Sequence, residues 1–447
     1  MHHLRCHVSG DVLTRTGYDL GPPTPASDLV FDEWVIWEDG ISEEEAVAVG
    51  LWNNPAYQEL LADLDITQAD IIQAAQLQNP QVTTMFPISA KQWEFALLVP
   101  LDVLYLRPVR VSAAELESRR VAERLAQDGL NVVRDIRLAY IDWQLSIQRV
   151  QLAEQGAALR NEVARIAEAR LAAGDVAELD VSAVRLDALV GTGEVSRTAR
   201  DADLARERLR YILGIQLSDV SLISPSSPPT RRAAYAEDLD LPSLVNEAVS
   251  SRPDLRAVEL AVFAAEERSE LARRNIWQVA GILPDINSRG FKGFEAGPGL
   301  RFTVPLFHQN QGQIAQAEAD AERLRRQYVN RRDLAAWEVR QAYIQFLQAQ
   351  TDLKLWRDQI LPQADQAVTS SRSALEEDRV SLLLVLETTR QLLNAQQRER
   401  ESEAQLRRSI AELERSVGRP LTDTMANAPM HSEMLPIPQV DVREATR

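Results

Sequence analysis

Few side chains in this sequence are of the types that bind metals or act as nucleophiles. Histidine occurs five times and cysteine once. The N-terminal residues His2, His3, Cys6 and His7 could together bind a metal, but a cluster this close to the start of a chain is more often incidental. His308 stands alone, and one imidazole is a poor ligand set for a metal that takes four ligands. We therefore predict no metal site, and the single cysteine excludes an internal disulfide.

The sequence also lacks the motifs of common enzyme classes. It contains no glycine-rich phosphate loop, no nucleophile elbow and no pair of histidines at helical spacing. We therefore predict no catalysis and no cofactor. The formal net charge of −17 argues against nucleic acid as a partner, because phosphate binding requires a basic surface. No apolar run reaches the length of about 18 residues that a membrane-spanning helix needs.

The elements that would position any functional residue are mainly helices. Residues 1–40 contain a cluster of prolines and little helical periodicity, and we predict an extended tail there. After this tail, Ser42 and Glu45 fit a capping box at the start of a helix. Asn54 precedes a proline, which biases it away from helical geometry and predicts a boundary before a second helix.

The apolar period changes along the first half of the chain. Over about residues 81–106 it is that of strands, and two strands with a short turn are the simplest interpretation. From about 109 to 171 apolar residues return every three or four positions, which predicts a long helix with a coiled-coil seam. Gly174 ends this helix, and another is predicted over about 178–213. Aromatic residues on the helix seams are expected in the core: Tyr140, Trp143, Trp337 and Tyr343.

The second half of the sequence repeats the first at an offset near 200 residues. The matching segments are Asn54-Pro55 with Arg252-Pro253, Val99-Pro100-Leu101 with Val304-Pro305-Leu306, and Ala139-Tyr140-Ile141 with Ala342-Tyr343-Ile344. This offset is too long for a solenoid and indicates duplication of a whole module. We predict a first repeat at 41–223, a proline-rich linker at 224–240, a second repeat at 241–421 with a strand pair at about 279–307, and a polar tail at 422–447.

The predicted strands require further copies of the chain. Four strands are too few to close a barrel, and isolated strands leave unpaired edges. A ring of three chains would supply about 12 strands, an even number within the range of membrane barrels, and the helices would continue the barrel as a tube. The alternative is a soluble coiled-coil scaffold, which the long seams would serve equally well. A scaffold needs no strands, so the two extended regions favour the barrel.

Several motifs resemble those of the outer-membrane efflux protein family, the TolC-like exit ducts of tripartite pumps and type I secretion systems. They are Asn53-Asn54-Pro55, Asn79-Pro80, Ala173-Gly174-Asp175, Ser251-Arg252-Pro253-Asp254, Val304-Pro305-Leu306-Phe307 and Leu392-Leu393-Asn394-Ala395. The resemblance covers roughly residues 41–421, and the duplicated order makes it specific. It implies a mainly helical homotrimer, with a 12-stranded β-barrel in the outer membrane and an α-helical barrel across the periplasm.

The resemblance also implies how such a protein works. An inner-membrane pump of the RND or ABC type supplies the energy, a periplasmic adaptor docks on the tips of the helical hairpins, and the duct conducts passively through the outer membrane lipid. The docking tips correspond here to Gly174, Asp175 and Val176, and to Arg379 and Val380. A sharp helix reversal at Gly174 favours positive φ in any case.

In the family, the helix after the second tip carries acidic residues that narrow the tunnel mouth. Glu387 aligns with one such position, and together with Asp378 it is expected to line the tunnel entrance and favour cations. The acidic position one turn earlier is Leu384 in this sequence, which departs from the family's two acidic rings. The alternative for Glu387 is a solvated charge on a helix face.

Two further interpretations concern cargo and anchoring. The segment Phe307–Gly312 has the Phe-x-x-Asn-Gln-Gly pattern of the heavy-metal (CzcC-like) branch, which suggests export of divalent cations, with drugs or proteins as the alternatives. Cys6 would suit a lipid anchor, since many family members are lipoproteins. The preceding His3-Leu4-Arg5, however, lacks the small residue normally found before a lipidated cysteine.

Overall fold

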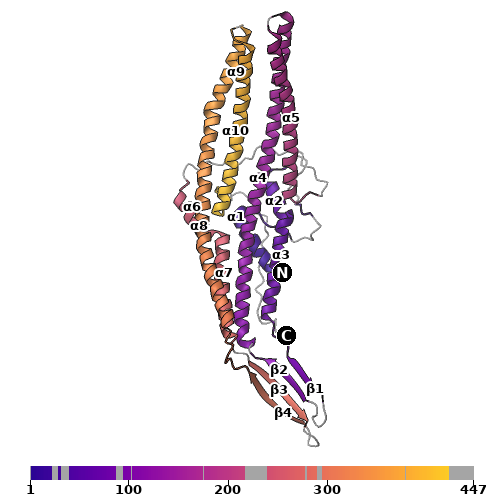
Figure 1. Ribbon diagram of the computed structural model, residues 1–447, viewed down its shortest axis with the longest axis vertical. Coiled ribbons are helices and arrows are strands. Elements are labelled where there is room, and N and C mark those ends of the chain that lie inside the picture. Colours follow the sequence, from indigo (N-terminus) through magenta and orange to yellow (C-terminus); the bar gives the residue numbers. More distant parts are fainter. Residues whose placement is uncertain are drawn as a thin grey trace, which may run out of the picture.

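The chain is elongated, with two helical hairpins at one end, a layer of helices through the middle and a four-stranded sheet at the other end (Figure 1). The computed structural model describes residues 2–22, 29–31, 40–86, 94–101, 103–174, 176–216, 239–276, 279–288, 294–377 and 379–421. The predicted polar tail at 422–447 and nearly all of the predicted linker at 224–240 lie outside these ranges.

The two halves of the chain have the same order of elements. The first half contains α1 (His2–Thr16), α2 (Glu43–Asn53), α3 (Pro55–Ala75), β1 (Gln81–Met85), β2 (Glu94–Pro100), α4 (Val103–Ala173) and α5 (Glu178–Ile212). The second half contains α6 (Leu241–Ser251), α7 (Pro253–Arg274), β3 (Val279–Ser288), β4 (Phe294–Phe302), α8 (Gln311–Leu355), the π-helix η2 (Trp356–Ile360), α9 (Leu361–Glu376) and α10 (Leu382–Val417). From α2 onward, each element has a counterpart, and α8, η2 and α9 together correspond to α4.

The capping box predicted at the start of α2 is confirmed. The Ser42 hydroxyl accepts a hydrogen bond from the Glu45 amide at 3.2 Å, and the Glu45 carboxylate accepts one from the Ser42 amide at 2.7 Å. These bonds satisfy donors that the first turn of a helix leaves free. At the far end, the Asn54 side chain accepts from the Tyr57 amide at 3.0 Å and so caps α3. Short-range polar pairs therefore fix both boundaries of α2.

The prediction of an extended tail over residues 1–40 is wrong for residues 2–16, which form α1. This helix buries Val8 and Val12 completely and packs on α3 and α4. Gly129 of α4 makes the approach possible, since a Cβ there would lie 2.7 Å from the Tyr57 hydroxyl and 3.0 Å from a Val12 methyl. Only a few apolar side chains mark α1 in the sequence, so its stability comes from packing on the helix layer and not from a periodic pattern.

The four strands form one antiparallel sheet in the order β1-β2-β3-β4. The pairing of β2 with β3 joins the two halves of the chain, with Leu98 opposite Ile282. β1 pairs with β2 alone, and β4 pairs with β3 alone, among the strands described. The strands lie within the two regions predicted for them, but α4 begins at Val103, so the last residues of the first region are helical.

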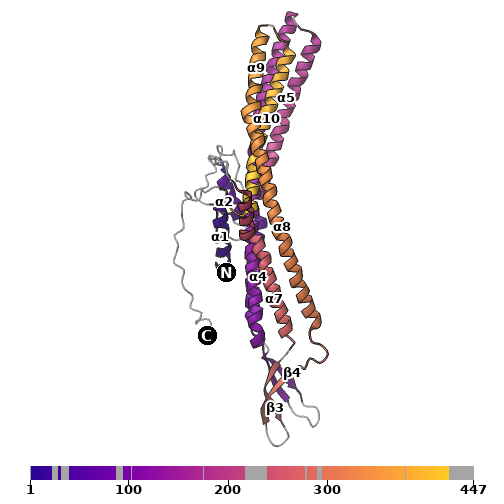
Figure 2. The same ribbon diagram turned by 90° about the vertical axis from the view of Figure 1, so that its left-hand side faces the viewer.

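The longer helices lie side by side in a single curved layer, and α1 and α2 lie against one face of it (Figures 1 and 2). In the half nearer the sheet the order is α3, α4, α7, α8, and in the half nearer the hairpin tips it is α5, α4, α10, α9. α5 and α8 therefore lie on opposite sides of the layer (Figure 1). Among the described residues, no helix is both long enough and apolar enough to cross a membrane.

The predicted coiled-coil seam of α4 forms the largest part of the core. Ile136, Tyr140 and Trp143 are almost fully buried, and the Tyr140 and Trp143 rings meet edge to face with centroids 6.1 Å apart. The corresponding prediction for the second half is wrong at Trp337, whose side chain is 56% exposed on α8. Because α8 lies at a side of the layer, one of its apolar faces has no partner within the described part of the chain.

Candidate channel end and central ion network

The first hairpin reverses direction at Gly174, as predicted. Its φ is +83°, a left-handed conformation that costs a residue with a Cβ about 1–2 kcal/mol. The Gly174 amide bonds to the Leu171 carbonyl at 3.0 Å, and a Cβ at this position would meet no atom within 4 Å. Val176 is half-buried against a small apolar cluster that joins α4 and α5. Asp175 lies outside the described residues.

The second hairpin reverses between α9 and α10. The Arg379 amide bonds to the Ala374 carbonyl at 2.9 Å, and its guanidinium forms an exposed ion pair with Glu377 at 2.9 Å. Val380 is half-buried. Asp378 lies outside the described residues. The two tips lie at the same end of the molecule (Figure 1), which brings the predicted docking residues of both repeats together.

Glu387 lies in the second turn of α10, close to the second tip, and is exposed. Its carboxylate accepts a hydrogen bond from Gln391, one turn further along the helix, at 3.3 Å. Leu384 is 45% exposed on the same helix. The exposed carboxylate fits both the tunnel-lining interpretation and that of a solvated helix face.

An ion triad around a buried aspartate joins the two hairpins and was missed in the sequence. Asp187 of α5 is 7% exposed and pairs with Arg390 of α10 and with Arg160 of α4, the latter at 3.4 Å. A carboxylate buried among apolar side chains is costly unless it is paired. The sequence feature that could have revealed this triad is an aspartate on the apolar face of α5, between Val184 and Ala188. Its main partner lies 203 residues away in the sequence.

A second buried network lies at the centre of the molecule, where α2, α4 and α10 meet. Arg137 is 7% exposed; it bonds to Glu414 and lies 3.7 Å from Glu43. Arg407 of α10 pairs with the same Glu43 at 2.7 Å. Burial alone would lower the pKa of Arg137, but the Glu414 and Glu43 carboxylates outweigh it and raise that pKa above its ordinary value. The guanidinium is therefore a permanent cation that links both halves of the chain.

Equivalent residues of the two halves tie each pair of short helices to the end of its long hairpin. Asn54 donates from its side-chain amide to the Ile212 carbonyl at the end of α5, at 2.8 Å. Arg252 donates to the Ser416 carbonyl at the end of α10, at 3.1 Å. Both residues directly precede the first proline of a helix. Both halves of the chain therefore have the same contact, but an amide side chain makes it in the first half and a guanidinium makes it in the second.

The metal-binding residue types are dispersed. No group of three or more His, Cys, Asp or Glu side chains suited to a metal occurs in the described part of the chain. His7 pairs with Asp11 along α1 at 3.3 Å, and His308 is exposed between β4 and α8. Cys6 has a free, exposed thiol on α1. α1 lies on one face of the helix layer and not beside the strands (Figure 2).

A duplicated chain with paired hairpins at one end and a four-stranded sheet at the other has the architecture of the outer-membrane efflux channels. The sequence profile of the outer membrane efflux protein family matches residues 244–419. The cobalt-zinc-cadmium resistance protein CzcC of Cupriavidus metallidurans is 26% identical over 374 residues, which cover 79% of this chain and 84% of that protein. The second half of the chain thus matches the outer membrane efflux protein family, and the similarity to CzcC extends over most of the chain. Together these similarities indicate efflux at the outer membrane.

Solved structures have the same fold. A membrane protein from Pseudomonas aeruginosa superposes with a TM-score of 0.73 at 19% identity, covering 89% of this chain and 99% of that one. The outer-membrane channel OprN superposes with a TM-score of 0.72 at 19% identity, covering 88% of this chain and 94% of that one. The predicted family and the predicted mainly helical fold class are therefore confirmed.

Proposed function

We propose that three copies of this chain form a closed exit duct, which conducts substrates passively from an inner-membrane pump of the RND or ABC type and a periplasmic adaptor to the exterior. Channels of this family trimerise and work with such adaptors and pumps. One observation carries the proposal. In the described part of the chain, the sheet has two unpaired outer edges, and the helix layer has apolar side chains exposed on both of its sides. The alternative of a soluble coiled-coil scaffold gives no role to the sheet.

The sheet supports closure by further copies. The outer edges of β1 and β4 are unpaired among the described strands, and open edges are templates for pairing with another chain. Since the four strands alternate in direction, β4 of one copy and β1 of the next would be antiparallel. Three copies would then supply the 12 strands of a closed barrel, an even number of the kind found in membrane barrels.

The helix layer supports the same arrangement. On α5, apolar side chains at heptad-related positions are exposed, namely Val190 (60%), Leu204 (70%) and Tyr211 (68%). On α8, Trp337 (56%) and Ile344 (62%) are exposed seven residues apart. A seven-residue apolar repeat is the seam of a coiled coil. Since α5 and α8 lie on opposite sides of the layer, the seam of one copy can pack on that of the next.

Charge substitutions on the two seams test this assembly. We expect Leu204→Asp and Ile344→Asp each to abolish the trimer, because the carboxylate would be buried without a partner. Native mass spectrometry of the detergent-solubilised protein should give three times the 50.1 kDa chain mass for the unmodified protein and for the control Leu13→Asp, whose leucine is 45% exposed on α1. Trimers of both seam variants, or a monomeric unmodified protein, would contradict the proposal.

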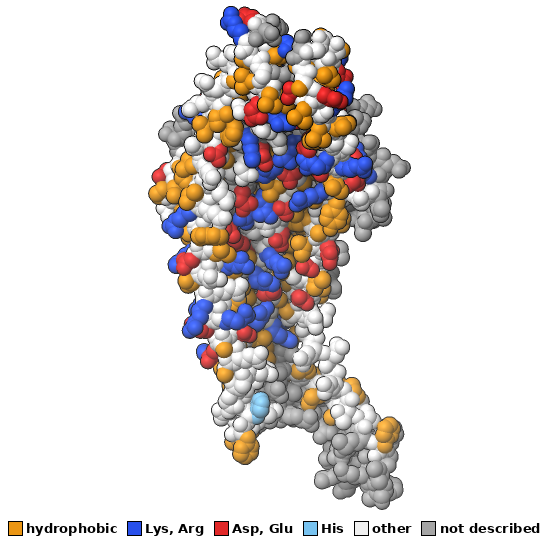
Figure 3. Space-filling view, turned by 45° about the horizontal axis from the view of Figure 1, so that its top comes forward, with side chains coloured by type: hydrophobic (Ala, Val, Ile, Leu, Met, Phe, Trp, Pro, Cys, Tyr) orange, Lys and Arg blue, Asp and Glu red, His pale blue; other side chains and the backbone are white. Residues whose placement is uncertain are grey.

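The hairpin end is the proposed adaptor-docking end. Leu179 (80%) and Leu383 (68%) are strongly exposed there, beside the predicted docking residues of the two tips. On the face drawn in Figure 3, hydrophobic side chains lie among charged ones at the hairpin end, and charges of both signs alternate along the middle. Exposed apolar patches mark interaction sites more often than solvated surface. These features support contact of Gly174, Val176, Arg379 and Val380 with an adaptor.

The predicted acidic entrance is tested by ion selectivity. Three copies would place three Glu387 carboxylates around the axis, where an acidic ring favours cations. We expect Glu387→Gln and Asp378→Asn each to reduce the preference for potassium over chloride, measured as a reversal potential in a planar bilayer under a salt gradient. The control Glu162→Gln removes an exposed carboxylate of α4 and should change nothing. Unchanged selectivity in both acidic-site variants would refute the tunnel-lining role.

The proposal also concerns the exported substrate and the attachment of the chain to lipid. The name of the relative CzcC and the Phe307–Gly312 segment together support divalent cations as the exported substrates. Lipid attachment at Cys6 stays a prediction. α1 buries Val8 and Val12 in the helix layer and leaves the Cys6 thiol exposed.

A further inference from the structure

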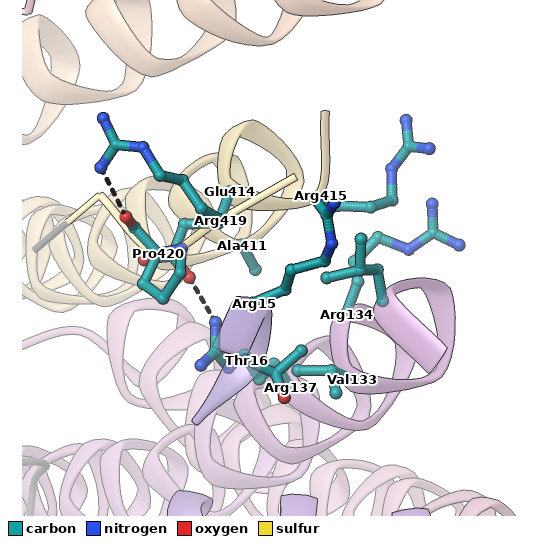
Figure 4. A pocket seen from close by; sticks show the side chains of 11 residues that line it. Arg15, Thr16, Val133, Arg134, Arg137, Ala411, Glu414, Arg415, Arg419 and Pro420 are labelled. Carbon is teal, nitrogen blue, oxygen red and sulfur yellow. Dashed lines mark hydrogen bonds and ion pairs between the residues drawn. The ribbon is translucent and has the colours of Figure 1, made fainter. Parts of the chain in front are cut away.

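A small cavity lies where the end of α1 meets the ends of the two halves of the chain (Figure 4). Its volume is about 20 Å³. Five arginines line it, and they come from three segments: Arg15 from α1, Arg134 and Arg137 from α4, and Arg415 and Arg419 from the end of α10 and the residues after it. The only carboxylate among the lining residues is Glu414. Arginine is therefore the commonest residue type in the wall of the cavity.

Most of these arginines already have counter-charges. Each of four pairs with a carboxylate: Arg134 with Asp135 (2.7 Å), Arg137 with Glu414, Arg415 with Glu412 (2.7 Å) and Arg419 with Glu247 (3.0 Å). The second oxygen of Glu414 accepts from the Leu421 amide at 3.2 Å.

Arg15 differs from the other four. Its single hydrogen bond in the described structure is a long one, to the Gly418 carbonyl at 3.5 Å, and no described carboxylate lies within 4.0 Å of its guanidinium. Burial lowers the pKa of Arg15, and Arg256 lowers it further, while Asp11 and Glu123 raise it from a greater distance without compensating. A partly desolvated cation with free donors is costly, and a bound anion would remove that cost.

We propose that this cavity binds one monatomic anion, chloride in the cell, between Arg15 and the arginines at the end of α10. The small volume of the cavity favours a monatomic anion. A single water needs about 10–15 Å³ of such space, so about 20 Å³ accommodates one chloride-sized ion. The ion would fasten α1 to the end of α10, and so join the first helix of the chain to its last.

Thermal unfolding of the full-length protein in detergent tests the site. At a fixed ionic strength, sodium chloride or bromide should raise the melting temperature above that in sodium gluconate. At ten times the dissociation constant, the ratio of folded to unfolded protein rises about elevenfold, which is a shift of about 1–2 °C for a chain of this size. Arg15→Gln should abolish this dependence on the anion, and Arg165→Gln, which changes an exposed arginine of α4, should retain it.

A second readout separates an ion site from a general salt effect. Crystals grown in bromide should show anomalous density beside Arg15 in the unmodified protein and none in Arg15→Gln. Three results would overturn the proposal: no difference between halide and gluconate, an equal difference in Arg15→Gln, or stabilisation by phosphate without stabilisation by halide. Because the readout is the response to the anion, a general loss of stability in Arg15→Gln does not obscure it.

Discussion

Gly214→Ala is expected to cost the protein about 4 kcal/mol or more of its free energy of unfolding, a loss found only where a substitution cannot be accommodated. Gly214 follows α5 with a φ of +74°. A Cβ here would lie 1.9 Å from the Asn53 carbonyl oxygen at the end of α2. Backbone cannot move aside as a flexible side chain can. The loss should appear in urea unfolding followed by tryptophan fluorescence, and in the yield of folded protein.

Alanine substitutions at two other glycines distinguish the cost of the steric clash from the cost of the backbone conformation. Gly174 and Gly418 also have positive φ, +83° and +90°. A Cβ at Gly174 would meet nothing within 4 Å, and one at Gly418 would meet Arg252 at 3.6 Å, an ordinary contact. Alanine at either position should therefore cost only about 1–2 kcal/mol. If Gly214→Ala were no worse than these two, the close packing of α2 against the end of α5 would be disproved.

Arg137→Met has the second largest expected effect, about 3–5 kcal/mol, because it leaves the buried Glu414 carboxylate without its main cation. Glu414, 8% exposed, would lose its main partner, while Glu43 would keep Arg407. The free energy of unfolding by urea measures the loss. The control Arg165→Met breaks a pair with Glu162 in which both side chains are at least half exposed, and it should leave the unfolding curve unchanged.

The double variant Arg137→Met with Glu414→Leu tests the cause. Removing both members of a buried pair leaves no uncompensated charge, so the double variant should be more stable than Arg137→Met alone. A double variant as unstable as the sum of the single ones would mean that Arg137 acts through packing of its side chain. In either case the site joins α2 and α4 of the first half to α10 of the second, and so holds together the helices that carry the two hairpins.

The sequence alone determined those features that depend on neighbours within a few residues. The capping box of Ser42 and Glu45, the boundary at Asn54 and the reversal at Gly174 each follow from local hydrogen bonding or from the backbone freedom of one residue. The order of helices and strands could also be predicted from the sequence. The spacing of apolar residues distinguishes a helix from a strand, and the two halves of the duplication repeat the same order. This order indicated the fold class, and together with motifs such as Asn53-Asn54-Pro55 it supported the resemblance to the family.

Only the tertiary structure decided which faces meet. An apolar stripe shows that a face is buried but not what covers it, so α1 was missed and Trp337 was placed in the core although it lies on a side of the layer. The pairing of Asp187 with Arg390 and the gathering of arginines around Arg15 join residues hundreds of positions apart. Nothing local encodes such contacts, since they arise when the two halves of the chain pack side by side and bring remote charges into a medium of low dielectric, where each must find a partner.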